Sequence, residues 1–242
     1  MLDVLDRFLE SARQIKKQRT LNKLQRPLEK ATIKIFTAQR KAVIAALKRL
    51  READSTDDLP LPGTAQMQAA IESAVGTALE AGAAMQATEL RIALRFDLEN
   101  ARAIAYLDGY AAAQVTAINE TTRDLLRTLI ASNTDLSYTD LAKKITEAFQ
   151  EFTPRRARLI AVTEVGNAYT EGTMIVARDL QDAGLTMEKQ WLTSGDSKVS
   201  DGCLDNAAAG WIDLDEEFPS DDQRPLRFPG CRCDLLIRRR AK

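Results

Sequence analysis

Apolar residues recur every three or four positions through residues 1–52, which predicts a long helix. The spacing is that of a heptad seam. Pro27 lies inside the pattern, and because proline removes a helix hydrogen bond, we expect a kink or break near Gln25 and Arg26. A helix with one narrow apolar stripe needs a partner, either another helix or another chain. The seam consists of Leu21, Leu24, Leu28, Ala31, Ile35, Ala38, Ala42 and Ala45.

The segment 53–63 interrupts this pattern with two prolines, a glycine and three aspartates, and is predicted to be a linker. A second helix is expected to begin at Thr64. Gly76 and Gly82 lower its helix propensity by ~1 kcal/mol each. Because a glycine has no side chain, both positions permit close contact between helices.

The stretch Phe96–Ala131 again has helical periodicity. After a turn at 132–135, Ser137 is expected to cap the next helix, with Asp140 completing an approximate capping box. Thr153 followed by Pro154 repeats the pattern of a helix start.

The helix predicted from Pro154 ends at Gly184, a residue type typical of helix C-termini. Glu164 lies on or beside its inward face, where an isolated charge would be very costly, so we expect it to be paired. The predicted inward positions are Ala157, Ile160, Ala161, Val165, Ala168, Gly172, Ile175 and Val176.

Helical periodicity stops after Gly184, and three short segments, Met187–Thr193, Gly210–Leu214 and Cys231–Arg238, are separated by Gly, Pro, Asp and Ser. The last partly alternates and is predicted to be a strand. The fold class is therefore mainly α, with a small α+β C-terminal module. The expected organisation is a basic helical arm (1–52), a linker (53–63), a helical body (64–184) and a Cys-containing module (185–242).

The chain of 242 residues contains no histidine, which removes His-based triads, His acid–base steps and His metal sites. No apolar run approaches the ~20 residues that a membrane helix needs. The start lacks the plan of a secretory signal, so we expect the chain to stay in the cytoplasm where it is made. In that compartment its three cysteines are not expected to form a disulfide scaffold.

Charge is strongly segregated. Residues 13–51 contain thirteen Lys/Arg and one acid, Glu29, whereas 201–222 contain eight acids and no base. Residues 224–242 contain seven bases and a single acid, Asp234. Such sorting indicates surfaces for different partners, or simply solvated faces. The arm is the expected partner-binding element, through Leu21, Leu24, Leu28, Ile35, Lys34, Arg40 and Lys41.

Several segments together resemble the phage Mu F-like head morphogenesis family. The segment 160–165, followed by Ala168 and Gly172, is similar to the Ala-Arg-Thr-Glu-Val helix of that family. The segment 191–199 is similar to its Trp…Asp-x-Arg-Val element. Phe218 and the segment 229–233 match a later Phe and a terminal Pro-x-Cys-Arg-Cys element. Segments 96–100 and 118–123 are also similar, so the resemblance covers roughly Phe96–Ile237.

This chain departs from the family's pattern at four positions. Val162 replaces the usual Arg, and Lys198 stands where Arg is common. Ser200 and Phe228 occupy places where relatives often have Cys and His. Any metal site that the family builds is therefore short of ligands here.

The resemblance implies a structural minor head protein, not an enzyme, located in the virion at the head interior or portal vertex and in the host cytoplasm during assembly. The implied partner is the portal protein, with the major capsid or scaffolding protein as alternatives. Head assembly, DNA packaging and DNA ejection are the implied processes.

Two other functions stay open. The basic arm could contact packaged DNA non-specifically, since Lys and Arg that neutralise phosphates release counterions. Asp196, Asp201, Asp205 and Glu164 could hold Mg²⁺ for a nuclease-like reaction, although no independent catalytic signature accompanies them.

No cofactor is expected. Zinc is the candidate metal, with Cys203, Cys231 and Cys233 as three of the four ligands a structural site needs and Asp201 or Asp205 completing the set. The alternative, that the cysteines are reduced and fix a loop against the strand, is favoured. Arg232 is the expected partner of Glu164, in a structural clamp that also includes Trp191 and Asp196. Trp191 and Trp211 are expected to cover the small core.

Overall fold

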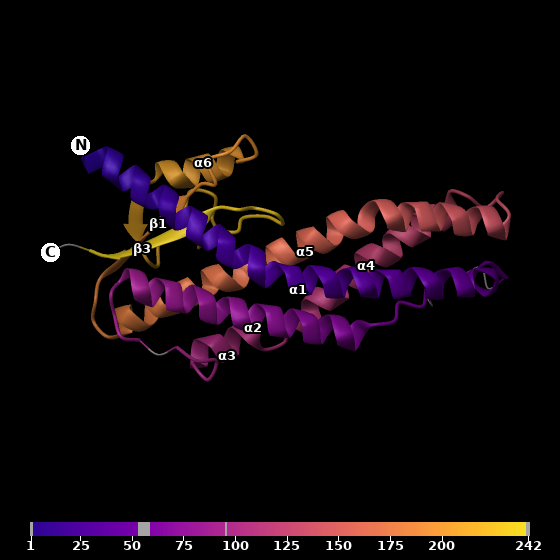
Figure 1. Cartoon of the computed structure of the whole chain (residues 1–242), viewed down its shortest axis with the longest axis horizontal. Helices are drawn as coiled ribbons and strands as arrows, with labels where there is room; N and C mark the ends of the chain where they lie inside the picture. The colour runs from indigo at the N-terminus through magenta and orange to yellow at the C-terminus, as the bar shows by residue number, and fades with distance from the viewer. Residues whose placement is uncertain (1, 53–58, 95, 241–242) are drawn as a thin grey trace. The chain divides into compact units, whose positions relative to one another are not determined.

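The computed structural model describes residues 2–52, 59–94 and 96–240. These residues form six helices and three short strands, so the predicted fold class, mainly α with a small α+β C-terminal module, is confirmed (Figure 1). The elements are α1 (Leu2–Glu52), α2 (Thr64–Glu89), α3 (Ala101–Leu107), α4 (Tyr110–Ala131), α5 (Tyr138–Asp182), β1 (Met187–Leu192), α6 (Asp201–Ala208), β2 (Trp211–Asp213) and β3 (Asp234–Arg239).

Helix α1 continues through Pro27, so of the predicted kink or break the break is absent, while the kink stays a prediction. The proline removes one backbone hydrogen bond, but the residues around it are held by packing, with Gln25 and Leu28 both buried. Leu28 is only 1% exposed. Burial on both sides of the proline outweighs the loss of that bond.

The buried row of α1 differs from the predicted seam. Beyond Leu28 it shifts by one position, so Ala38 and Ala45 are exposed, while Thr32 and Gln39 are buried. Both polar side chains donate hydrogen bonds: the Thr32 hydroxyl to the Leu28 carbonyl (2.8 Å), and the Gln39 side-chain amide to the Asn119 side chain (3.2 Å). Periodicity alone does not find polar residues on a buried face. The buried positions are Leu21, Gln25, Leu28, Thr32, Ile35, Phe36, Gln39, Val43 and Leu47.

The stretch predicted as one helix over Phe96–Ala131 is two helices. α3 begins only at Ala101, after Asn100, whose side chain accepts a hydrogen bond from the backbone of Arg102 (2.9 Å). Gly109 separates α3 from α4 with a φ of 68°, in the left-handed region that glycine adopts readily. The prediction that helix begins at Phe96 was wrong because a cap and a glycine terminate it locally.

Helix α5 begins after Ser137, as predicted: the Ser137 hydroxyl accepts from the backbone N–H of Asp140 (3.1 Å) and donates to its carboxylate (2.6 Å). The second start predicted at Pro154 is wrong, because α5 runs without interruption to Asp182. Thr153, beside the proline, is buried and held by packing. Gly184, with φ 89°, follows the end of α5 as predicted.

β1 and β2 fall inside the segments predicted for them, β3 extends one residue beyond its segment, and the three form one antiparallel sheet in the order β2-β1-β3. β1 is central, with Glu188 opposite Asp213 and Trp191 opposite Leu235. Sequence analysis missed α6, which contacts β1. α6 is capped by Ser200, whose side chain accepts from the backbone N–H of Cys203 (3.4 Å).

The described residues cluster into two compact units. Unit 1 comprises Met1–Arg26, Ala74–Tyr106 and Leu159–Lys242; unit 2 comprises Pro27–Ser73 and Leu107–Arg158. The four-segment organisation stays a prediction, and residues 53–58 of its linker lie outside the described part. None of the described helices is long and apolar enough to span a membrane.

Unit 2 has an aliphatic and aromatic core. Phe149 stacks against Phe152 with ring centroids 4.6 Å apart, and Arg156 lies over the Phe36 ring. Arg156 also donates to the Ile118 carbonyl (2.7 Å), so its charge is hydrogen-bonded despite burial. The buried cluster contains Val43, Leu47, Leu59, Leu126, Ile130, Leu141, Ile145 and Phe149.

Unit 1 depends on a close crossing of α2 and α5. A Cβ built on Gly82 would lie 1.9 Å from the Tyr169 carbonyl oxygen, and one on Gly172 would lie 2.0 Å from the Leu79 carbonyl oxygen. The two backbones therefore touch where only glycine fits, as expected of Gly82 from the sequence. All eight predicted inward positions of α5 are buried.

Candidate functional site

The C-terminal module has its own core within unit 1. Trp191 on β1 is 1% exposed and meets the ring of Phe218 edge-on, with centroids 5.2 Å apart. Trp211, by contrast, lies half-buried on the edge strand β2, where the guanidinium of Arg238 stacks on it at 4.1 Å. Only Trp191 contributes to the core cluster of the module, which also contains Met174, Ala177, Met187, Cys203, Leu214, Phe218, Cys231, Cys233, Leu235 and Ile237.

Two segments that carry the family resemblance, 160–165 and 229–233, meet in this module. The hydroxyl of Thr163 on α5 accepts a hydrogen bond from the backbone N–H of Gly230 (3.1 Å), which joins α5 to the turn before the Cys-Arg-Cys segment. A Cβ on Gly166 would lie 2.7 Å from the Leu226 side chain. Segments 160–165 and 229–233, far apart in the sequence, thus form one structural unit.

Arg232 makes its ion pair with Asp196 (2.6 Å) rather than the predicted pair with Glu164. The backbone N–H of Lys198 is the main cause that holds the pKa of Asp196 below its ordinary value, and Arg232 acts in the same direction. Both side chains are well exposed, so the pair adds little stability. Glu164 is buried on α5 and has an interaction partner of its own. The clamp observed therefore joins the loop after β1 to the Cys-Arg-Cys segment.

The three cysteines converge in the core of the module. Cys203, Cys231 and Cys233 are all buried and reduced, and their sulfur atoms lie within 4.8 Å of one another. The Cys203 and Cys231 sulfurs are 3.9 Å apart. The Cys233 thiol, which hydrogen-bonds Cys231, is the main cause that lowers the pKa of Cys231 below its ordinary value. The cluster therefore places three potential sulfur ligands together in the core of the module.

Ser200 and Phe228 are two of the positions at which the chain departs from the pattern that it resembles. Ser200 caps α6, and Phe228 is 38% exposed. The Phe228 carbonyl accepts from the backbone N–H of Cys231 (3.0 Å) in the turn through Gly230, whose φ is 83°.

The first part of α1 is fastened to the module within unit 1. Lys17, 6% exposed, makes an ion pair with the buried carboxylate of Asp234 at the start of β3. Arg13 donates to the Leu235 carbonyl (2.9 Å) and pairs with Glu89 of α2 (2.9 Å). A second link joins Gln14 and the Thr193 carbonyl (2.7 Å). We call these contacts the arm clamp.

Burial and charge act on the groups around the arm clamp. Burial is the main cause that raises the pKa of Glu89, and Arg13 opposes it. Burial also raises the pKa of the Tyr169 hydroxyl, whose ring lies 5.3 Å below the Lys17 ammonium. Because Lys17 and Asp234 are both desolvated, removal of the Lys17 charge would leave the buried Asp234 carboxylate with only the longer Arg13 pair (3.5 Å).

The apolar residues predicted to bind a partner are used inside the chain. Leu21, Leu28 and Ile35 are buried, and Leu24 is half-buried. The chain therefore fills the apolar stripe of α1 itself. The basic residues predicted to bind a partner differ in exposure: Lys34 and Lys41 are exposed, and Arg40 is half-buried.

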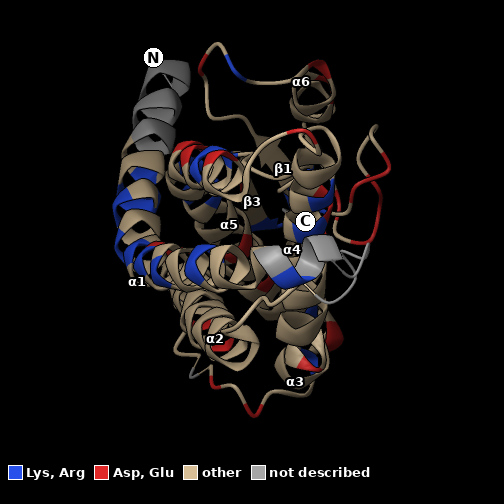
Figure 2. Ribbon diagram, turned by 90° about the vertical axis from the view of Figure 1, so that its right-hand side faces the viewer, with Lys and Arg blue, Asp and Glu red and all other residues tan. Residues whose placement is uncertain are grey.

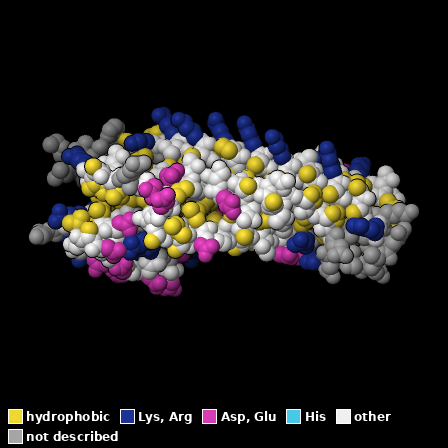
Figure 3. Space-filling view, turned by 90° about the horizontal axis from the view of Figure 1, so that it is seen from below, with side chains coloured by type: hydrophobic (Ala, Val, Ile, Leu, Met, Phe, Trp, Pro, Cys, Tyr) yellow, Lys and Arg dark blue, Asp and Glu magenta, His cyan; other side chains and the backbone are white. Residues whose placement is uncertain are grey.

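The exposed basic residues of α1 follow helical spacing on the side away from the buried row, and Figure 2 shows their blue positions recurring along the helix. Side chains of this type project from the surface in Figure 3. We call the exposed set the outer basic face. In unit 1 it comprises Lys16, Arg19, Lys23 and Arg26, and in unit 2 Lys30, Lys34, Lys41 and Arg49.

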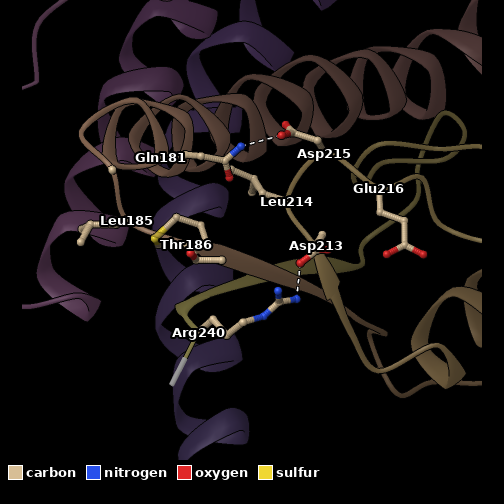
Figure 4. A pocket seen from close by; sticks show the side chains of 10 residues that line it. Gln181, Leu185, Thr186, Asp213, Leu214, Asp215, Glu216 and Arg240 are labelled. Atoms are coloured by element: carbon tan, nitrogen blue, oxygen red, sulfur yellow. Dashed lines mark hydrogen bonds and ion pairs between the residues drawn. The ribbon is translucent and has the colours of Figure 1, made fainter. Parts of the chain in front are cut away.

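An acid-lined pocket lies between the end of α5 and β2 (Figure 4). Two of its three acids are engaged by side chains of the same chain: Gln181 donates to Asp215 (2.5 Å), and Arg240 pairs with Asp213. The acids considered for Mg²⁺ at the sequence level are not gathered. Within residues 2–52, 59–94 and 96–240, the only group of three or more Cys, Asp or Glu close enough to share an ion is the three cysteines.

Lys189 on β1 is completely buried. Its ammonium donates to the backbone carbonyl (2.9 Å) and side-chain oxygen (3.0 Å) of Gln223 and lies 5.2 Å from the centre of the Phe218 ring. Burial lowers the pKa of Lys189 to about 8. The lysine holds the loop before Arg224 against the sheet.

Sequence reasoning missed the arm clamp. The signal present was that Asp234 is the only acid in the basic segment 224–242. A lone acid beside an apolar strand is a candidate for a buried ion pair. Its partner, Lys17, lies 217 residues away in the sequence, and no periodicity joins the two.

Comparison with protein families identifies residues 131–236, which match the family described as Phage Mu protein F like protein. The match covers α5, β1, α6, β2 and the first residues of β3, and it confirms the family resemblance over that region. The similarity of segments 96–100 and 118–123 lies outside it and stays a prediction. No curated protein and no solved structure matches the chain. The family relates the chain to phage heads.

Proposed function

From the premise that this is a phage Mu F-like protein, we propose that it is a structural minor head protein of a tailed phage, bound to the portal or inner capsid and acting in head morphogenesis. The family match over residues 131–236 is the observation that carries the proposal. A structural role also agrees with how the candidate acids are used, since Asp196 is paired with Arg232 and Asp201 and Asp205 are dispersed on the surface of α6.

The outer basic face supports a partner contact through charge. The apolar stripe of α1 is already filled by the chain, so the exposed lysines and arginines are what the helix offers outward. Such a face suits an acidic protein surface, and electrostatic attraction of this kind speeds association and weakens with salt. The portal protein is the first candidate, and the major capsid and scaffolding proteins are the others.

The proposal is tested by a pull-down of the full chain against the portal and major capsid proteins of the same phage. Deletion of residues 1–52 is unsuitable, because it would remove the arm clamp and the buried row. A triple variant, Lys30→Gln, Lys34→Gln and Lys41→Gln, removes charge from exposed positions of unit 2. Its matched control is Lys143→Gln, Lys144→Gln and Arg155→Gln, three exposed basic positions of α5 in the same unit.

We expect the wild-type chain and the α5 control to retain portal protein and the α1 variant to lose it. Failure of the wild-type chain to bind portal, capsid or scaffolding protein would contradict the proposal.

A second candidate function, non-specific binding of packaged DNA, is favoured by the same exposed charges. Phosphate contacts would make retention on DNA fall steeply with added salt. DNA retention by the wild-type chain, lost in the α1 variant and unaccompanied by binding to any head protein, would favour this alternative.

A further inference from the structure

The three cysteines have the spacing of a metal site. The sulfurs of Cys203, Cys231 and Cys233 lie within 4.8 Å of one another, and those of Cys203 and Cys231 are 3.9 Å apart. With a Zn–S distance of about 2.3 Å, two sulfurs of a tetrahedral zinc site stand about 3.8 Å apart. An ion could therefore enter with little movement of the side chains.

Two of the thiols lie beside backbone N–H groups. Cys203 lies in the first turn of α6, three residues after the cap Ser200. The sulfur of Cys231 faces the backbone N–H groups of Cys233 and Arg227. Metal-bound sulfur retains negative charge and benefits from such donors.

A buried donor beside the cluster has no other use. The indole N–H of Trp191 lies next to the Cys233 sulfur, and within the described residues it finds no regular hydrogen-bond partner. Trp191 is 1% exposed, so water does not satisfy this group. A buried N–H without a partner is costly, and a thiolate beside it would accept its hydrogen bond.

The simpler interpretation is that the cysteines are small apolar residues packed in a core. That interpretation does not account for the convergence: these are all the cysteines in the chain, they come from two segments, and each sulfur meets the others. It also leaves the Trp191 N–H unsatisfied.

We infer that Cys203, Cys231 and Cys233 together bind one zinc ion, which ties α6 to the segment before β3. No Asp or Glu among the described residues joins the three sulfurs, so the fourth position is left to water or a small external ligand. Asp201 and Asp205, the acids first considered for that position, are exposed and outside the cluster. The site would staple a module whose own core is small.

The test uses the full chain, stripped of metal by a chelator under reducing conditions and then titrated with Zn²⁺ or Co²⁺. Native mass spectrometry is expected to show one metal per chain. The cobalt form is expected to show sulfur-to-cobalt charge-transfer bands, which require thiolate ligands. Zinc is expected to slow the reaction of all three thiols with a thiol reagent by ~10-fold or more and to raise the unfolding midpoint as its concentration increases.

Variants assign the ligands. Cys203→Ser, Cys231→Ser and Cys233→Ser are each expected to lose the cobalt bands. Asp205→Asn, a change of an exposed acid on α6, is the matched control and should bind metal as the wild-type chain does. Where a serine variant fails to fold, the wild-type spectrum and thiol protection still decide the matter.

Three results would overturn the inference. The first is the absence of binding at micromolar zinc. The second is bound metal that leaves the thiols reactive or gives no charge-transfer band. The third is a purified chain lighter by two hydrogens and free of metal, because it would mean a disulfide between two of the cysteines.

Discussion

The two units of the chain are held by different kinds of contact. Unit 2 is held by aliphatic and aromatic side chains, such as Leu126 and Phe149, packed in one cluster. Unit 1 also has a hydrophobic core, but it adds contacts that each demand a particular residue: the glycine crossing of α2 and α5, the Lys17–Asp234 pair, and three converging thiols.

The difference shows why one part of a helical protein carries a recognisable pattern. An aliphatic core accepts many combinations of similar volume, so its sequence can drift while the fold persists. A backbone-to-backbone crossing at Gly172 or a buried ion pair accepts almost no substitution. Much of the family match, from residue 159 to residue 236, lies in unit 1.

The largest expected effect is in unit 2. Phe149 is 2% exposed, so Phe149→Ala should lower the free energy of unfolding by about 3–5 kcal/mol through lost burial and a cavity. Chemical denaturation followed by circular dichroism would measure the loss. The exposed neighbour Gln150→Ala is the control and should change little. A loss under about 1 kcal/mol for Phe149→Ala would contradict the proposed core of unit 2.

In unit 1, Lys17→Met should lower the free energy of unfolding by about 3–4 kcal/mol, because it leaves the Asp234 carboxylate buried with only Arg13 nearby at 3.5 Å. Trp191 and Trp211, the two tryptophans of the chain, both lie in unit 1, so their fluorescence reports its unfolding. Lys16→Met, at an exposed neighbour, is the control. The double variant Lys17→Met, Asp234→Leu should recover much of the loss; no recovery would argue against the pairing.

The crossing of α2 and α5 gives the next effect. Gly172→Ala places a methyl group 2.0 Å from the Leu79 carbonyl oxygen, so the two helices must separate. We expect this to lower the free energy of unfolding by about 2–3 kcal/mol. Ala84→Gly, at an exposed position of α2, is expected to cost about 1 kcal/mol through helix propensity alone. Equal unfolding midpoints for the two variants, measured by tryptophan fluorescence, would contradict the close contact between the two helix backbones.

The smallest effect depends on pH. The folded-state pKa of Lys189, lowered by burial to about 8, lies below its ordinary value of 10.5, so the folded chain releases this proton first. The unfolded chain binds more protons between pH 8 and 10.5, and stability should rise with pH in that window by about 1–2 kcal/mol. Lys189→Met lacks this titration, so the difference in unfolding free energy between it and the wild-type chain should change across the window. A constant difference would contradict the shift.

The sequence predicts the elements better than their contacts. Apolar periodicity located α1, α2, α4 and α5, and turn residues such as Gly184 located their ends. It could not find the buried Thr32 and Gln39, because a polar residue on a core face depends on a partner elsewhere. It missed α6, since eight residues are too few for a periodic signal.

The candidate site followed the same rule. The residue types were visible in the sequence, including three cysteines and one acid in a basic tail. The partners of these residues were not visible. Lys17 and Asp234 are 217 residues apart in the sequence. Arg232 pairs with Asp196, although the predicted inward position of Glu164 on α5 had suggested Glu164 as its partner. Long-range pairing is decided by topology, which local patterns do not encode.

The central claim is that the inner face of α1 serves the chain and the outer basic face serves a partner. Lysine labelling with mass spectrometry tests it most directly, on the free chain and on the chain bound to portal protein. We predict that Lys17 and Lys189, both buried, react slowly in both states, whereas Lys23, Lys30 and Lys34 react quickly in the free chain and become protected in the complex. Equal labelling of the exposed lysines in both states, or rapid labelling of Lys17 in the free chain, would contradict the claim.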